Sequence, residues 1–347
     1  MAIKTYTSSS VGDIQYNISQ LGGADSQLGV IVPKLAPYII GAFLNNSFFM
    51  NFTGRMLQPY VKEGMKVNET ITYQKIQTLA NVYDLSSTDT FTPTTQPVVP
   101  ETLIIDKWQG SSYSFNQWDS ILPTDPGSLW SEFVRNTIAP IVNGMDTRMM
   151  TLATSANNVY TLTGTPKKGT GTCISLDDLT YIELELFEQN NPGGLNSTYA
   201  MISPWDYAEL VNDTTLSSVD KAGTILALWE GRLPTVRGFN LIRNNNIVYT
   251  TNTSASTKSY NNFFYNKDAV QLVTLDLTVD RAMDEMIQDT SFVTFYDQRS
   301  GLRVRMRIIG TGKTAAPSVT VAFDVAYAME MTLPDFAVLA VSTQSLA

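Results

Sequence analysis

The sequence predicts an α+β protein organised around one long helix. Between Asp125 and Ala156 the apolar residues recur every three or four positions, which places them on one face of a helix of about thirty residues, roughly 45 Å long. Asp125 and Pro126 supply an N-cap and a proline at the first helical position. Pro140 lies mid-helix and should kink it without ending it. Because strand-like sequence precedes and follows this helix, we expect it to support other elements rather than to join a bundle.

The composition of the 347 residues narrows the possible functions. The chain has no histidine and one cysteine, Cys173, so it lacks the commonest general base and transition-metal ligand and has no intrachain disulfide. We therefore expect no enzyme activity, no metal site and no cofactor. A net charge of −9 disfavours tight binding of the whole chain to nucleic acid. No signal peptide or membrane span is expected, because the longest early apolar run, Tyr38–Leu44, is far shorter than the roughly twenty residues that a bilayer requires.

Residues 1–55 are predicted to form an N-terminal arm followed by a short helix. The first 32 residues are polar, rich in glycine and serine, and without a sustained apolar period, so we expect them to become ordered only against a partner. Pro33 then opens a helix with one apolar face. That face contains Leu35, Ile39, Ala42, Phe43, Phe49 and Met50.

Residues 56–120 are predicted to form a long two-stranded excursion. Lys66–Tyr73 and Thr102–Trp108 have strand-like composition, and the polar stretch Ile76–Pro100 separates them. A structureless loop of that length is unusual inside a compact domain, and an isolated β-ribbon is at best marginally stable in water. Because the rest of the chain offers no spare element to support the ribbon, we expect another subunit to supply the surface.

Residues 121–173 complete the long helix and lead through a β-rich crossing, 159–163, into an α+β unit at residues 174–288. Ser175 is expected to cap a helix with a buried apolar side. That side contains Leu179, Ile182, Leu186 and Phe187. The elements expected next are a strand Thr198–Ile202, a helix that begins at Ser203-Pro204, a helix Ala222–Trp229, a strand Gly238–Ile242 and a polar loop Arg243–Asn262.

Residues 289–347 are predicted to return to β structure and to complete the unit that contains the long helix. Phe292–Tyr296 and Leu302–Ile309 flank a turn and should pair as a hairpin. From Val319 to Met331, large apolar residues alternate with smaller or polar ones, which is typical of a long strand with one face on a core. A proline should end that strand, and Phe336–Val341 should form a short final one.

Two short motifs match parts of catalytic sites but lack their companions. Gly310-Thr311-Gly312-Lys313-Thr314 matches the end of a phosphate-binding loop, yet position 307 is arginine instead of glycine, and strand-like sequence follows instead of a helix. A tight hairpin turn explains these glycines. Ser218 and Lys221 match a Ser-x-x-Lys pattern, but Ala315 stands where the companion Lys-Thr-Gly motif requires glycine. We interpret Ser218–Lys221 as a loop that leads into a helix.

Opposite charges gather in two segments of the final third of the chain. Arg303, Arg305 and Arg307 share one strand face, and acidic residues cluster before them. That acidic cluster includes Asp280, Asp284 and Glu285. Each group is expected to be solvated unless the two meet, within or between subunits, to form ion pairs. Exposed pairs contribute little each, although a network sets register and specificity. No spacing argues for a carboxylate-bound magnesium ion.

Four stretches, together with the order of the elements, connect the sequence to a known family. They are Gly64-Met65-Lys66-Val67, Ile202-Ser203-Pro204-Trp205-Asp206-Tyr207, the run from Leu228-Trp229-Glu230-Gly231 to Gly238-Phe239-Asn240-Leu241, and the ending from Gly301-Leu302-Arg303-Val304 through Pro334-Asp335-Phe336. The whole chain resembles the major capsid (coat) protein of tailed double-stranded DNA bacteriophages. The resemblance implies the tailed-phage major capsid protein fold. Its parts are an N-terminal arm (1–55), an extended β-hairpin or E-loop (56–120), a spine helix with a peripheral β-sheet (121–173 and 289–347) and an α+β axial domain (174–288).

The resemblance also implies a structural shell protein that self-assembles through hexamers and pentamers into an icosahedral capsid around double-stranded DNA. The implied partners are further copies of the chain, a portal and scaffolding proteins, with decoration proteins left open. The DNA is enclosed without sequence-specific binding, no membrane is involved, and the location is the virion after assembly in the host cytoplasm. Some members of the family crosslink through an E-loop lysine. Lys75 and Lys107 lie in that region, but no activating partner accompanies them, so we expect no crosslink.

Two sets of side chains are predicted to matter for assembly. The E-loop residues expected to contact a neighbouring subunit are Tyr73, Val82, Tyr83, Phe91 and Trp108. Trp130, Phe133 and Met145 are expected to pack the spine helix on the peripheral sheet.

Two other functions remain compatible with the sequence. A bacterial nanocompartment shell protein of the same fold would package protein cargo instead of DNA. A β-rich phage tail protein or adhesin would bind glycans through the Thr- and Asn-rich loops and would be monomeric or trimeric in solution.

Overall fold

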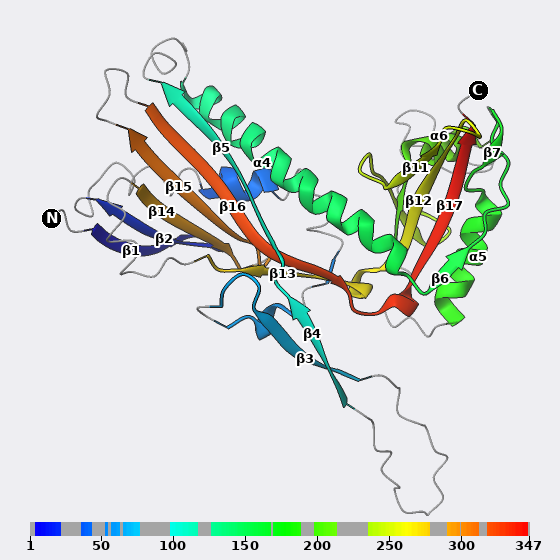
Figure 1. The fold of residues 1–347 in the computed structure, drawn as a ribbon, viewed down its shortest axis with the longest axis horizontal. Coiled ribbons are helices and arrows are strands. Elements are labelled where there is room, and N and C mark those ends of the chain that lie inside the picture. The colour runs from blue at the N-terminus through cyan, green and yellow to red at the C-terminus, as the bar shows by residue number, and fades with distance from the viewer. Residues whose placement is uncertain are drawn as a thin grey trace, which may run out of the picture.

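Figure 1 shows two β-sheet bodies, a long helix that runs from one toward the other, and a two-stranded ribbon that projects away from both. We call the seven-stranded sheet the peripheral sheet and the eight-stranded sheet the axial sheet. The computed structural model describes residues 4–21, 36–43, 53–54, 57–62, 65–76, 98–116, 126–167, 169–188, 198–213, 235–277, 290–298, 300–311 and 318–345.

The peripheral sheet is antiparallel and centred on its longest strand, β16. Its strands are β1 (Lys4–Val11), β2 (Ile14–Leu21), β5 (Lys107–Asn116), β13 (Val270–Leu275), β14 (Thr290–Asp297), β15 (Arg303–Thr311) and β16 (Ser318–Met331). They follow the order β1-β2-β14-β15-β16-β13, and β5 also pairs with β16, from Lys107 opposite Tyr327 to Asn116 opposite Ser318. The predicted β14–β15 hairpin and the long alternating strand are therefore confirmed.

The long helix, α4 (Pro126–Thr151), lies along the peripheral sheet (Figure 1). It continues through Pro140, and a 3-10 turn, Leu152–Ser155, extends it. The predicted long helix is confirmed at this position, whereas its cap Asp125 lies outside the described residues. No helix among the described residues is long and apolar enough to cross a membrane.

The core beneath α4 follows from the apolar period of its sequence. Val134, Ile138, Ile141, Met145 and Met149 are buried in one cluster with residues of the sheet. The sheet contributes Val321, Phe323, Val325 and Tyr327, which are alternate residues of β16 and so point to the same face. A short helical segment, 36–43, adds Ile39 and Phe43 to this cluster, as predicted for its apolar face, while Leu35, Phe49 and Met50 lie outside the described residues.

The axial sheet is mixed and carries two helices on one face. Its strands are β6 (Asn158–Tyr160), β7 (Gly171–Thr172), β8 (Thr198–Ile202), β9 (Thr235–Val236), β10 (Phe239–Arg243), β11 (Tyr249–Asn252), β12 (Thr257–Asn266) and β17 (Ala337–Ser345). The order is β6-β17-β12-β8-β10-β9, with β11 on β12 and β7 on β17. The helices α5 (Leu176–Glu188) and α6 (Pro204–Val211) pack on Ala200, Ile202, Phe264 and Val338. The opposite face, with Phe263 and Tyr265, belongs to the same core as α4.

Both axial helices begin where the sequence predicts. The backbone N–H of Asp178 donates to Ser175 Oγ (3.1 Å), and the backbone N–H of Ser175 donates to Asp178 Oδ2 (2.9 Å), which is a reciprocal capping box. Asp206 N–H donates to Ser203 Oγ (3.0 Å) at the start of α6. The predicted caps Ser175 and Ser203 are confirmed, whereas the predicted helix Ala222–Trp229 lies outside the described residues.

The projecting ribbon consists of β3 (Thr70–Ile76) and β4 (Val98–Ile104), which pair antiparallel from Thr70 opposite Ile104 to Ile76 opposite Val98. Its base packs on the face of the peripheral sheet opposite α4. Buried ribbon residues there are Ile71, Tyr73, Leu103 and Ile105, and the sheet supplies Val273, Leu275, Ala326 and Ala328. The expectation that the chain offers no support for the ribbon is therefore wrong for the base, and residues 77–97 lie outside the described part of the chain.

Four predicted boundaries are corrected by the strand pairing. Residues 4–21, expected to be an arm without structure of its own, form a hairpin on β14 around Gly12, whose φ is +59°. The excursion ends before residue 120, because β5 already belongs to the peripheral sheet. The expected polar loop Arg243–Asn262 contains β11 and much of β12. The final strand, β17, is nine residues long and pairs with β12 in the axial sheet instead of completing the peripheral one.

The outer edge of β13 is covered by the segment that leads to the ribbon. Gly54 N–H donates to Val270 O (2.8 Å), and Leu272 N–H donates to Gly54 O (3.2 Å). Two residues beyond Leu272 along β13, the side chain of Gln58 bonds both backbone groups of Thr274. The amide N–H of Gln58 donates to Thr274 O, and the amide oxygen accepts from Thr274 N–H, both at 3.0 Å. A side-chain amide thus makes the pair of hydrogen bonds that a neighbouring strand would make.

Candidate assembly surfaces

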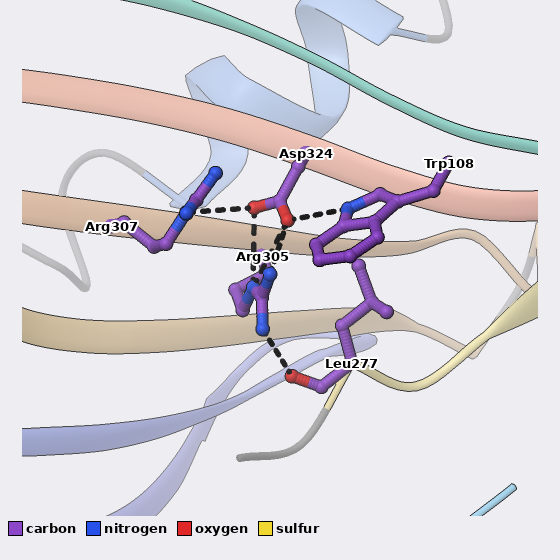
Figure 2. A network of polar contacts seen from close by, with 5 residues as sticks. All are labelled: Trp108, Leu277, Arg305, Arg307 and Asp324. Atoms are coloured by element: carbon purple, nitrogen blue, oxygen red, sulfur yellow. Dashed lines mark hydrogen bonds and ion pairs between the residues drawn. The ribbon is translucent and has the colours of Figure 1, made fainter. Parts of the chain in front are cut away.

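A buried carboxylate organises the face of the peripheral sheet beside the ribbon (Figure 2). Asp324 of β16 has no exposed surface and accepts a hydrogen bond from Trp108 Nε1 at 2.8 Å. Arg305 of β15 lies opposite it in register and donates from Nε at 3.2 Å and from Nη2. Arg307 Nε lies 3.5 Å from the second carboxylate oxygen. One aspartate of β16 therefore holds side chains from two neighbouring strands, β5 and β15, in a fixed arrangement.

Arg305 is shielded from water on both sides. The exposed fraction of this residue is 8%, and its guanidinium carbon lies 5.5 Å from the Trp108 ring and 5.9 Å from the Phe292 ring. Its Nη1 donates to Leu277 O at 3.4 Å, at the start of the acidic segment (Figure 2). The flat guanidinium suits stacking between rings while it pairs with the carboxylate.

Trp108 is the outermost member of this network. Its exposed fraction is 54%, although its indole N–H is fixed by Asp324. A large aromatic ring that is both exposed and held in one orientation loses little conformational entropy when it contacts a partner. The predicted contact of Trp108 with a neighbouring subunit stays a prediction, but the residue lies in β5 of the peripheral sheet rather than in the ribbon.

Tyr73 lies at the base of the ribbon and is almost fully buried within the chain. Its hydroxyl donates to Glu101 Oε2 across the ribbon at 2.7 Å. Burial, and then the nearby Glu101 carboxylate, raise the pKa of Tyr73 well above its ordinary range, so the hydroxyl keeps its proton. Its predicted contact with a neighbour also stays a prediction. Val82, Tyr83 and Phe91 lie outside the described residues.

The predicted spine residues lie in or near the interface between α4 and the sheet. Met145 is fully buried among residues of β16, and Phe133 makes an edge-on contact with Tyr113 of β5, with ring centroids 5.0 Å apart. The side chain of Trp130 is outside the described part of the structure. Tyr113 was not singled out in the sequence, where its alternation with serines resembles that of a solvated strand.

The arginine stripe predicted on β15 is present, but its described partner is a residue that sequence reasoning missed. Arg305 and Arg307 pair with Asp324, whereas Arg303 lies over the Tyr296 ring at 4.9 Å. The signal for Asp324 was available, because it is the one acidic residue among the apolar alternation of Val319–Met329. Asp280, Asp284 and Glu285 lie outside the described residues.

The described residues place no catalytic group beside either of the two short motifs that match parts of catalytic sites. Gly310 and Thr311 end β15 and pair antiparallel with Val319 and Ser318 of β16, and residues 312–317 lie outside the described residues. Ser218 and Lys221 lie outside the described residues. Within the described ranges, no group of three or more acidic or cysteine side chains is placed to hold a metal ion.

The outward face of α5 departs from the prediction. Phe187 was expected on the buried side with Leu179, Ile182 and Leu186, but 53% of it is exposed, while the other three are buried. The helix turns by about 100° per residue, which places Phe187 beside Leu184 rather than beside Ile182. Leu184 and Tyr181, also exposed by more than half, continue the same apolar stripe.

The sequence matches no family model, and no curated protein matches it. Solved structures match it in fold. The capsid structure of the cyanophage P-SCSP1u is 15% identical with a TM-score of 0.53, and the match covers 80% of this chain and 84% of the other. A Mycobacterium phage Che8 structure is 15% identical at 0.51, covering 85% and 90%. The mature capsid of bacteriophage PhiM1 is 12% identical at 0.50, covering 85% and 86%.

This chain has the phage capsid protein fold. The predicted fold class, α+β with the tailed-phage major capsid architecture, is thereby confirmed. Within the capsid fold, the β3–β4 ribbon is the element predicted as the E-loop, and α4 is the predicted spine helix. At these identities the likeness concerns the fold, so the function is argued below from this chain.

Proposed function

We propose that the chain is a structural subunit that assembles through hexamers and pentamers into the icosahedral capsid of a tailed phage, around its double-stranded DNA. The observation that carries this proposal is the fold shared with phage capsids over at least four fifths of the chain. The projecting ribbon supports it, because the ribbon's base is anchored by buried residues while the strands extend away from the body (Figure 1). Such an element is placed to reach another subunit.

The charge of the chain is consistent with a container for DNA. Its 32 acidic and 23 basic residues give a net charge of −9, which weakens attraction to phosphates and favours enclosure without sequence-specific binding. The further partners that we propose are a portal and scaffolding proteins during assembly in the host cytoplasm, with the virion as the final location. Decoration proteins are left open, and we propose neither enzymatic activity nor a cofactor.

Electron microscopy of the purified chain, alone and co-expressed with candidate scaffolding proteins, tests the proposal directly. We expect closed particles of uniform size. Nuclease-protected double-stranded DNA in particles isolated from infected cells supports the phage capsid, whereas packaged protein cargo would identify a nanocompartment. A stable monomer or trimer under all these conditions contradicts the shell function and favours a tail protein or adhesin.

The role of the ribbon can be tested without disturbing its base. Because Ile76 pairs with Val98, residues 77–97 can be replaced by an Asn-Gly turn that closes the hairpin. We expect this variant to keep the wild-type circular dichroism spectrum and thermal midpoint but to form no stable particles. Full-sized shells from this folded variant would show that the outer part of the ribbon is dispensable for assembly.

A further inference from the structure

The helix α5 is apolar on two opposite sides, although only one of them is covered. Leu179, Ile182 and Leu186 pack inward on the axial sheet. Tyr181, Leu184 and Phe187 face outward and are 59%, 52% and 53% exposed. Three large apolar side chains on successive turns form a continuous stripe, which is unusual on the solvent-exposed face of a helix.

The same helix carries an unbalanced charge. Residues 176–188 contain five carboxylates and no lysine or arginine. Asp178 is turned inward, whereas Asp177 and Glu188 are exposed and Glu185 is half-buried. At 100° per residue, Asp177, Glu185 and Glu188 fall within or beside the arc of the apolar stripe. A surface that covers this stripe should therefore be apolar at its centre and basic around it.

The axial body itself carries such a surface, which we call the aromatic–basic platform. It consists of Trp205, Arg243, Tyr249, Lys258 and Tyr260. The Tyr260 ring lies 6.3 Å from the Trp205 ring and 6.1 Å from the Tyr249 ring, measured between centroids. Lys258 Nζ lies 3.7 Å from the Tyr249 ring centre and 5.1 Å from that of Tyr260. More than half of Tyr249 is exposed. The exposed Arg243 places its guanidinium carbon 5.9 Å from the ring centre of Tyr207 on α6, the helix that carries Trp205.

We propose that the α5 stripe of one subunit docks on the aromatic–basic platform of the next subunit. The platform lies on β10, β11, β12 and α6, whereas α5 lies beside β17 (Figure 1), so one copy can use both surfaces at once. A contact between two different surfaces repeats head to tail and closes into a ring when the rotation allows it. The inference rests on the proposed shell function for the identity of the partner, a second copy of this chain.

Substitutions in the stripe and the platform test the contact through assembly. We expect Leu184→Asp to lower the sedimenting fraction at least tenfold, because it places a charge at the centre of the contact, while Leu184→Met keeps wild-type assembly. Lys258→Glu should also reduce assembly, and adding Glu185→Lys and Glu188→Lys to it should restore it. All of these residues lie at the surface, so an unchanged thermal midpoint of the unassembled variants confirms that folding is intact. Wild-type assembly by Leu184→Asp would overturn the inference.

A crosslinking experiment separates this inference from the shell function. The double variant Leu184→Cys, Tyr249→Cys should form disulfide-linked dimers and a ladder of larger species after mild oxidation with diamide, whereas either single variant should not form the ladder. The native Cys173 is buried and serves as the common background. A ladder without shells would support the contact and contradict the capsid proposal. Shells that form without a ladder would support the capsid and overturn the contact, and the absence of both would overturn both.

Discussion

The peripheral sheet and the axial body, which includes α5 and α6, both bury carboxylates, and they compensate the negative charge by different means. In the peripheral sheet Asp324 is paired with the guanidinium of Arg305. In the axial body Asp178, in the first turn of α5, is buried with no cation among its described hydrogen-bond partners. Its carboxylate accepts hydrogen bonds from the backbone N–H groups of Ser175 (2.9 Å), Thr163 (3.0 Å) and Gly164 (3.1 Å). It also accepts hydrogen bonds from the hydroxyls of Ser175 and Thr163.

Asp206, the second axial carboxylate, is buried as well, but its pKa shifts in the opposite direction from that of Asp178. Its donors are mainly side chains, namely Ser203 Oγ at 2.6 Å, Asn262 Nδ2 at 2.8 Å and Ser342 Oγ at 2.5 Å, with one backbone N–H from Ile174 at 3.2 Å. Burial raises the pKa of Asp206 and its hydrogen bonds offset this only in part. At Asp178 burial acts in the same direction, but the bonds from Ser175 and Thr163 prevail and lower its pKa. The sign of each pKa shift therefore follows from whether burial or the hydrogen bonds prevail, and at Asp178 the hydroxyls of Ser175 and Thr163 contribute more than the backbone N–H groups of the same residues.

The largest effect should come from breaking the ion pair of the peripheral sheet. Arg305→Met leaves Asp324 buried without its main countercharge, and we expect a loss of about 3–5 kcal/mol in the free energy of unfolding, measured by urea titration. The double variant Arg305→Met, Asp324→Leu should recover most of this loss, because it removes both charges. If the single variant is as stable as wild type, Arg307 and Trp108 must be sufficient partners for Asp324.

A smaller loss of stability is expected from removing Asp178, whose charge is stabilised by hydrogen bonds instead of by a cation. Asp178→Ala removes the cap of α5 and leaves buried N–H groups of Thr163 and Gly164 without an acceptor, for an expected loss of about 2–3 kcal/mol in the free energy of unfolding. Asp177→Ala, on the exposed side of the same turn, is the matched control and should change stability by less than about 0.5 kcal/mol. Equal losses in the two variants would show that the helix dipole, not the hydrogen-bond set, accounts for the effect.

The pH dependence should differ in sign between the two axial carboxylates. The folded pKa of Asp178 lies below the ordinary 3.8, so its stabilisation is present above that value and is lost as pH falls through the folded pKa. The folded pKa of Asp206 lies above 3.8, so its contribution grows as pH falls through the folded pKa and is complete below 3.8. Each unit of difference in pKa corresponds to about 1.4 kcal/mol.

Urea midpoints measured between pH 3 and pH 8 for wild type, Asp178→Asn and Asp206→Asn check these signs. The Asp178→Asn variant should lose less stability than wild type at the acid end. The Asp206→Asn variant should lose the gain in stability that wild type shows as pH falls toward 3.8. A wild-type curve unchanged by Asp206→Asn would argue against a raised pKa for Asp206.

The smallest effect is expected at the edge of the peripheral network. About a third of the Arg307 side chain is exposed, and its Nε lies 3.5 Å from Asp324, so Arg307→Met should cost no more than about 1 kcal/mol in the free energy of unfolding. Raising the salt concentration should shrink the difference between this variant and wild type, because an exposed pair is screened. A cost that matches that of Arg305→Met would place Arg307, and not Arg305, as the main partner of Asp324.

Features that depend on local chemistry could be predicted from the sequence. The apolar period of α4, the caps Ser175 and Ser203, and the alternation of Val319–Met331 each follow from residues close together in the chain, and the structure contains each element. β15 and β16 pair with each other as a hairpin there requires, whereas the tight turn expected at Gly310 and Gly312 stays a prediction, because residues 312–317 lie outside the described part of the chain.

Features that depend on which distant element covers a face could not be predicted. Periodicity shows that one side of a strand or helix is apolar, but not what packs against it. Trp108 was assigned to the ribbon because its own strand-like sequence does not indicate that β16 is its neighbour. The same limitation explains β17 in the axial sheet and the exposure of Phe187. The N-terminal hairpin was missed because β1 is rich in serine and threonine, although Val11-Gly12-Asp13-Ile14 is a plausible two-residue turn.

The amide of Gln58 has a consequence for a molecule that works at very high local concentration. A bare strand edge is a template on which further chains add without limit, and growing shells bring many such edges together. Gln58 occupies both backbone groups of Thr274, and Gly54 occupies the carbonyl of Val270 and the N–H of Leu272, so the chain closes this edge to uncontrolled polymerisation. Assembly then depends on surfaces whose geometry closes the particle at a finite number of subunits.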